Sequence, residues 1–153
     1  MKGLRLKDKK SFHHAISSIT RELDGFQWLL ESESVNIPEN DNSSKISQLI
    51  DGDCNWYYSN ENIIKLYSKA INEDWNTIFS FKADKSGIRD WARNYWKQKD
   101  RAKYITNNCE TVFINVDSAY WEIYSNNDNV LNSIRKQFPV LELPELTTEN
   151  PGI

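Results

Sequence analysis

The clearest secondary-structure pattern in the chain is in Thr111–Tyr124, with the sequence TVFINVDSAYWEIY. Its first part, Val112–Val116, is rich in β-branched and aromatic residues, which favour strands. Either Asp117-Ser118 or Ser118-Ala119 can form a turn, and Tyr120–Tyr124 is again typical of a strand. The segment therefore predicts an antiparallel hairpin.

A helix is expected directly after this hairpin, and further strands and helices are expected before the hairpin. The helix follows Asn126–Asp128 and has one apolar face, formed by Val130, Leu131, Ile134 and Phe138. Upstream we expect strands over Met1–Lys7 and Thr77–Ala83, and over Phe26–Ile37 either a strand or a hairpin. Helices are expected over residues 11–23, from Ser59 or Asn60 to about Asn72, and from Ser86 or Gly87 to about Lys99.

These elements predict one α+β domain over residues 1–138, with an extended C-terminal tail over residues 139–153. The sheet is expected to be mixed or antiparallel, with about four helices packed against it. The last expected helix before the hairpin has a wide apolar face, formed by Ile88, Trp91, Ala92, Tyr95 and Trp96.

The composition is that of an ordinary globular domain, apart from its aromatic residues. The chain has 153 residues, of which 39% are hydrophobic and 27% charged, with six Trp, seven Tyr and six Phe. No run approaches the roughly 18 apolar residues of a membrane helix, and no apolar segment follows the basic N-terminus as in a signal peptide. We therefore expect a cytoplasmic protein that does not enter a membrane, with Cys54 and Cys109 as free thiols.

Charge is banded along the chain, although the net charge is only −3. Residues 1–23 are net basic by four charges, and residues 24–78, with ten acidic residues against three basic, are net acidic by seven. Residues 79–104 have eight basic residues against three acidic, and residues 105–153 are net acidic by five. Both an acidic and a basic surface are therefore expected, and such surfaces mainly steer partners.

Candidate catalytic and metal-ligating residues are few. The only histidines, His13 and His14, are adjacent on an expected helix and so do not share the face that two metal ligands need. Asp51-Gly52-Asp53 lacks the remainder of a calcium loop and is typical of a turn. We therefore predict no metal, no cofactor and no catalytic residues. An enzyme with an unrecognised site, based on carboxylates or on Cys109 with His14, remains an alternative.

A second alternative is a nucleic-acid-associated protein that uses the basic segment 87–103. Arg89, Arg93 and Lys97 have the i, i+4, i+8 spacing of one helix face, and aromatic residues are interleaved with them. The competing interpretation is that the aromatic residues are core and the cations a solvated face. The acidic net charge also argues against nucleic acid as the main partner.

The acidic band contains the residues we expect to bind a partner protein. Its acidic residues lie beside a group of Trp and Tyr residues, and aromatic anchors with a charged rim are typical of protein interfaces. The predicted patch comprises Glu31, Glu33, Asp51, Asp53, Trp56 and Tyr57.

The segment from Asn108 to Ile134 resembles an uncharacterised family of small bacterial α+β proteins. The resemblance rests on Asn108-Cys109, Val112, Val116–Tyr120 and Glu122–Tyr124, with weaker similarity at Met1–Leu4 and Phe26–Leu30. It covers about a third of the chain and implies no catalytic residues. By analogy of class, it implies an immunity partner of a secreted toxin. Together with the acidic band and its aromatic residues, this predicts a non-catalytic immunity protein that neutralises a cognate nuclease-type toxin by occluding its active site, and we expect it to be a monomer or weak dimer.

Overall fold

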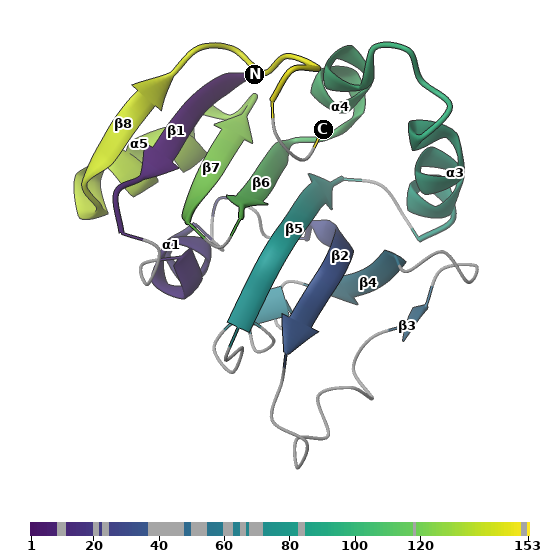
Figure 1. Ribbon diagram of the computed structural model, residues 1–153, viewed down its shortest axis with the longest axis horizontal. Helices are drawn as coiled ribbons and strands as arrows, with labels where there is room; N and C mark the ends of the chain where they lie inside the picture. Colours follow the sequence, from purple (N-terminus) through teal and green to yellow (C-terminus); the bar gives the residue numbers. More distant parts are fainter. Residues whose placement is uncertain are drawn as a thin grey trace.

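The computed structural model describes residues 1–8, 12–19, 22, 25–36, 48–49, 55–59, 63–64, 67, 72–82, 85–117, 119–150 and 153. Within these residues the protein is an α+β structure built on an eight-stranded sheet, in which every neighbouring pair is antiparallel (Figure 1). The strand order is β3-β4-β2-β5-β6-β7-β1-β8. The strands are β1 (Lys2–Leu6), β2 (Gln27–Asn36), β3 (Gln48–Leu49), β4 (Asn55–Ser59), β5 (Asn72–Phe81), β6 (Thr111–Val116), β7 (Tyr120–Ser125) and β8 (Val140–Leu143).

Helices cover both faces of the sheet. Those with described bounds are α1 (Phe12–Ser18), α3 (Lys85–Tyr95), α4 (Arg101–Asn108) and α5 (Asp128–Gln137). Buried residues of α1 and α5 pack with Trp28, Leu30 and Phe113 in one apolar cluster. Buried residues of α3 and α4 pack with Leu29 and Phe79 in a second cluster. Because successive strand residues point to opposite faces, neighbours such as Leu29 and Leu30 belong to different clusters.

The predicted hairpin is confirmed as β6 and β7, with Val116 opposite Tyr120. Its turn is closed by a hydrogen bond of 2.8 Å from the Ala119 N–H to the Val116 carbonyl. Asp117 has a φ of 49°, a left-handed conformation that Asp tolerates better than most residues. All six residues of β6 are buried, which follows from the cover on both faces of the sheet.

Strand β2 is continuous, and β5 begins earlier and is more polar than expected. Phe26–Ile37 is not a hairpin, because Gln27–Asn36 forms one continuous strand. β5 begins at Asn72, five positions before the expected start at Thr77. The polar ends of the two strands pair with each other, for example Ser34 with Asp74, so backbone pairing extends beyond the apolar pattern.

The expected helix from Ser86 or Gly87 to about Lys99 is wrong in its extent. α3 ends at Tyr95, and the next three residues form a turn in which the N–H of Gln98 donates to the Tyr95 carbonyl. A new helix, α4, starts at Arg101 because the Asp100 carboxylate accepts a hydrogen bond of 2.9 Å from the Lys103 N–H. The basic segment 87–103 is therefore two helices with a turn between them.

Residues after Pro139 also differ from the extended tail that we expected. Val140–Leu143 is extended, but it pairs with β1 as an edge strand of the sheet. Further along, the Leu146 N–H donates to the Met1 carbonyl, and the side chains of Leu146 and Ile153 are buried in the cluster beneath α3 and α4. The described residues of this segment thus belong to the same folded unit.

Candidate binding surfaces

The sheet brings together parts of the predicted acidic patch that are distant in sequence. Glu31 and Glu33 lie in β2, and Trp56 and Tyr57 lie in the neighbouring strand β4. Glu31 is opposite Asn55, and Leu30 is opposite Trp56. Asp51 and Asp53 lie outside the described residues, as do the side chains of Glu33, Trp56 and Tyr57.

Among the residues of the predicted patch, Glu31 is the one whose side chain the structure describes. It acts electrostatically on Tyr95 of α3. It is half-buried, opposite Thr77 in β5. Burial raises the pKa of the Tyr95 phenol, and the negative charge of Glu31 raises it further, whereas Arg101 lowers it. Glu31 is therefore close enough to α3 to act on Tyr95, at the border between the acidic strands and the basic helices.

The predicted basic row of Arg89, Arg93 and Lys97 is not one continuous helix face. Arg89 is half-buried in α3, and the Arg93 guanidinium lies 3.8 Å from the Asp90 carboxylate. Lys97 lies beyond the end of α3, in the turn. The row that the sequence predicts is broken because the helix stops at Tyr95.

The turn between α3 and α4 forms a different basic surface, which lies within the predicted basic segment 87–103 but not on the predicted row of Arg89, Arg93 and Lys97. A groove of about 440 Å³ lies there, with Lys97, Lys99 and Lys103 among its lining residues. Beside it Trp96 is 60% exposed, and the Arg101 guanidinium lies 5.0 Å from its ring centroid. We call Trp96, Lys97, Lys99, Arg101 and Lys103 the Trp96 groove.

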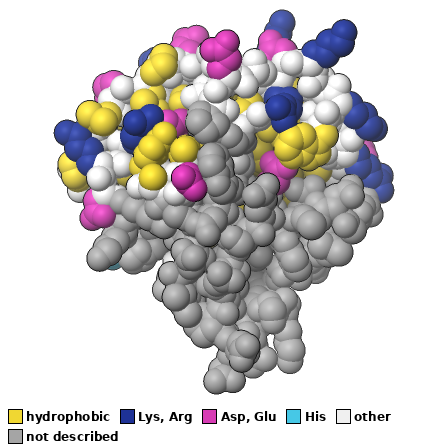
Figure 2. All heavy atoms as spheres, viewed as in Figure 1, with side chains coloured by type: hydrophobic (Ala, Val, Ile, Leu, Met, Phe, Trp, Pro, Cys, Tyr) yellow, Lys and Arg dark blue, Asp and Glu magenta, His cyan; other side chains and the backbone are white. Residues whose placement is uncertain are grey.

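Figure 2 shows Lys and Arg side chains gathered along the margin that α3 and α4 occupy. The sequence signal for it was Asp100, a residue type suited to the start of a helix.

An aromatic stack beneath the groove fixes the position of this turn. The Trp91 ring is stacked between Tyr95, at 5.0 Å, and Tyr104, at 5.5 Å between centroids. Phe79 of β5 contacts Trp91 from the sheet at 4.9 Å. Tyr95 in turn meets the Trp96 ring edge-on at 5.0 Å. Trp96 is thus held against a rigid core cluster although its own ring is exposed.

A second cavity, of about 340 Å³, lies over β1 and β7 and contains a buried ion pair. The Glu122 side chain is only 3% exposed, and one oxygen accepts a hydrogen bond of 2.8 Å from Arg5. Its other oxygen accepts one of 2.9 Å from the Tyr124 hydroxyl, which itself accepts one of 2.7 Å from the Asn150 amide. These contacts satisfy the buried carboxylate and hold the C-terminal segment on the sheet.

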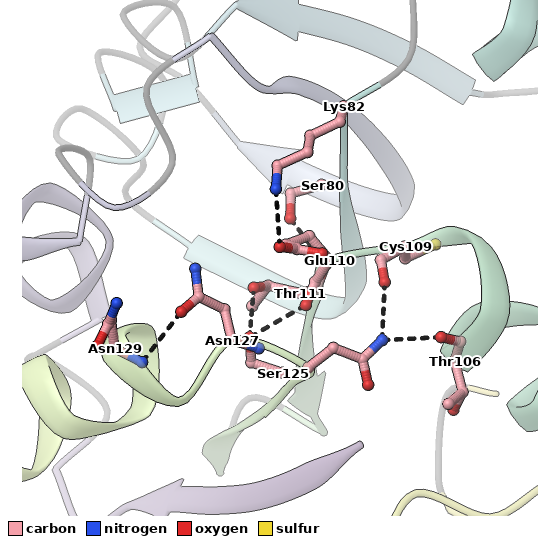
Figure 3. Close-up of polar contacts among 10 residues, drawn as sticks. Ser80, Lys82, Thr106, Cys109, Glu110, Thr111, Ser125, Asn127 and Asn129 are labelled. Carbon is pink, nitrogen blue, oxygen red and sulfur yellow. Dashed lines mark hydrogen bonds and ion pairs between the residues drawn. The ribbon is translucent and has the colours of Figure 1, made fainter.

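Cys109 is not placed as a nucleophile. Its side chain is 3% exposed, and burial raises the pKa of its thiol. In Figure 3 the sulfur points away from the polar contacts around Ser125, while the Cys109 carbonyl accepts a hydrogen bond from Asn126. His14 is exposed on α1, which covers the opposite face of the sheet. The structure therefore contradicts a site made by Cys109 and His14.

The polar contacts in Figure 3 tie strands to helices. The Ser125 hydroxyl lies 2.9 Å from the Thr111 hydroxyl and donates to the Glu110 carbonyl at 3.0 Å. The Asn127 N–H donates to the same Ser125 oxygen, and the Asn127 side chain caps α5. These residues join the end of β7 to the start of α5, which is a structural role.

The part of the chain that the structure describes contains neither a metal-ligand cluster nor a membrane-spanning helix. In the described ranges, no cluster of three His, Cys, Asp or Glu residues is arranged to hold a metal ion. No described helix has the length and apolar character that would let it cross a membrane. No protein-family model, curated protein or solved structure matches the chain.

Proposed function

We propose that this chain is a non-catalytic protein-binding module that neutralises a nuclease-type bacterial toxin by occluding its active site. The observation that supports the proposal is the placement of the acidic band. Strands β3, β4 and β2 and most of β5 come from residues 24–78, which are net acidic by seven charges, and these four strands are consecutive in the sheet. The basic band instead forms α3 and α4.

In the proposed mechanism, acidic side chains of β2 and of the segment before β4 face the basic substrate groove of a nuclease. Such a groove binds phosphates, so a surface of carboxylates competes with the substrate for the same cations. Trp56 and Tyr57 supply the apolar anchors, as aromatic residues do at many interfaces. The proposal includes a cytoplasmic complex and a protein that is a monomer or a weak dimer before it binds.

The proposal is tested by charge reversal. The partner is first isolated from the native host, where an adjacent reading frame encoding a small toxin domain is expected. Glu31, Glu33, Asp51 and Asp53 are then changed to Lys, and the association rate is measured by stopped-flow fluorescence at several salt concentrations. We expect association to slow by about 10- to 1000-fold at low salt and to lose most of its salt dependence.

A matched control reverses charges outside the patch. Glu145 and Glu149 are exposed acids of the C-terminal segment, so Glu145→Lys and Glu149→Lys change the net charge without touching β2 or β4. The control reverses two charges and the patch variant four, so if the control slows association as much per reversed charge as the patch variant does, the effect comes from net charge and not from the patch. Unchanged association in the patch variant, or a partner without toxin activity, would refute the proposed function.

A further inference from the structure

We propose that the Trp96 groove binds single-stranded nucleic acid, with a base stacked on Trp96 and phosphates held by the lysines. This site is separate from the acidic strands, and the inference does not rest on the proposed toxin partner. It differs from the basic row predicted from the sequence, with which it shares only Lys97. Three observations support it: the exposure of Trp96, the lack of acidic partners for the lysines among the described residues, and the geometry of Arg101.

Trp96 is an exception among the large apolar side chains of the described residues, most of which are buried. In the described part of the chain, the only large apolar side chains that are exposed are Trp96, at 60%, and Leu141, at 47%. Trp28, Trp91 and Trp121 are all buried. An indole ring left in water next to cations is suited to stacking with a planar partner, because every base offers a π-face.

The lysines of the groove differ from several other described cations, which have acidic partners. Lys2 lies 3.0 Å from Asp128, Lys82 lies 3.3 Å from Glu110, and Arg135 lies 2.8 Å from Glu142. Among the described residues, no carboxylate lies within ion-pair distance of Lys97, Lys99 or Lys103.

The one acid that lines the groove, Asp100, offsets one of the three lysine charges but forms no ion pair with them. The Asp100 carboxylate accepts the Lys103 backbone N–H at 2.9 Å, so it is engaged in capping α4. Three lysine ammonium groups around one groove therefore favour an anionic ligand, and a phosphodiester chain supplies several anions in sequence.

The position of Arg101 also favours single-stranded nucleic acid as the ligand. Its guanidinium lies 5.0 Å from the Trp96 centroid and 5.9 Å from the Tyr95 centroid, so it is positioned by two rings. Its positive charge beside the exposed indole ring favours an electron-rich base or a phosphate at this position. In a duplex the base faces are already stacked on each other, so this arrangement selects a single strand.

The test is fluorescence anisotropy of a fluorescein-labelled oligothymidine titrated with the full chain, from about 50 mM to about 200 mM salt. We expect Trp96→Ala to weaken binding by about 5- to 150-fold, the effect of losing one stacked base, and Trp96→Phe to retain most of the affinity. Changing Lys97, Lys99 and Lys103 to Gln should reduce the salt slope by about 2, at roughly 0.7 for each phosphate that is no longer neutralised.

The matched control is Lys136→Gln with Leu141→Ala, which removes an exposed cation and an exposed apolar side chain elsewhere. It should bind like the wild type. Circular dichroism of each variant establishes that it is folded.

Three results would overturn the proposal. The first is wild-type protein that does not bind oligothymidine at low salt. The second is binding that Trp96→Ala leaves unchanged. The third is a polyglutamate peptide that competes as well as the oligonucleotide, because the groove would then recognise acidic protein.

Discussion

Tyr124→Phe tests whether the C-terminal segment is held by the polar network over β1 and β7. The Tyr124 hydroxyl donates to the Glu122 carboxylate at 2.9 Å and accepts from the Asn150 amide at 2.7 Å. The substitution removes both hydrogen bonds but keeps the ring. A bond to a charged group contributes about 1.5–3 kcal/mol and a neutral one about 0.5–1.5 kcal/mol, so we expect a loss of about 2–4 kcal/mol in the free energy of unfolding.

The assay is urea unfolding at neutral pH, followed by far-UV circular dichroism. Burial, with the Glu122 hydrogen bond, raises the pKa of Tyr124, so the hydroxyl keeps its proton at the pH of the assay. For a chain of this size the expected loss corresponds to a decrease in Tm of about 4–16 °C.

Tyr120→Phe is the matched control, because Tyr120 lies in the same strand and on the same face. Its ring lies under the Arg5 guanidinium at 3.9 Å, and its hydroxyl has no hydrogen bond to any described residue. We expect a change below about 0.5 kcal/mol, as for surface substitutions. If Tyr124→Phe is as stable as Tyr120→Phe, the network does not hold the segment and the reasoning is refuted.

Three further predictions concern other parts of the fold. Gly3→Ala should lower the free energy of unfolding by about 1–3 kcal/mol in urea titrations, because the added Cβ would clash with the Tyr124 ring; unchanged stability would show that the ring can move. In a Cys54→Ser background, Cys109 should not react with a thiol reagent until the protein is unfolded, since the side chain is buried; labelling of the native protein would contradict this. The Arg135 hydrogen bond lowers the pKa of Glu142, so its stabilisation is present at neutral pH and is lost as the pH falls through that lowered pKa. Glu142→Gln should therefore cost up to about 1 kcal/mol at pH 7 and nothing in acid, as measured by urea unfolding at each pH.

The strands and helices that were predicted correctly from the sequence are those with a strong apolar periodicity. The hairpin at Thr111–Tyr124 and the helix after Asp128 both have strong patterns and short connections, and both are confirmed. The first half of β5 has no such pattern. Its polar residues are strand only because β2 is beside them, and a contact between strands so distant in sequence cannot be found from local propensity.

The Trp96 groove was harder to predict from the sequence, because it depends on whether one side chain, Trp96, is buried or exposed. Trp96 continues the apolar spacing of Ile88, Trp91, Ala92 and Tyr95, so the pattern predicted that it would be buried. The helix ends one residue earlier, and the ring is exposed instead. Apolar periodicity indicates which residues of a helix share one face, but it does not specify the residue at which the helix ends. The Asp100 cap was the available signal for the second helix.

Glu31 belongs to the proposed acidic patch and acts electrostatically on Tyr95 of α3, so a substitution there distinguishes the two proposed surfaces. Its charge reaches Tyr95, whose ring contacts Trp96 and lies 5.9 Å from the Arg101 guanidinium. Glu31 therefore favours a basic partner at the acidic strands but opposes an anion in the Trp96 groove. Glu31→Gln should slow association with a toxin and raise oligothymidine affinity, because it removes a negative charge that acts on Tyr95 beside Trp96. Anisotropy titrations at low salt measure the second effect. A decrease in oligonucleotide affinity would mean that Glu31 supports the groove through its contacts rather than opposing it through its charge.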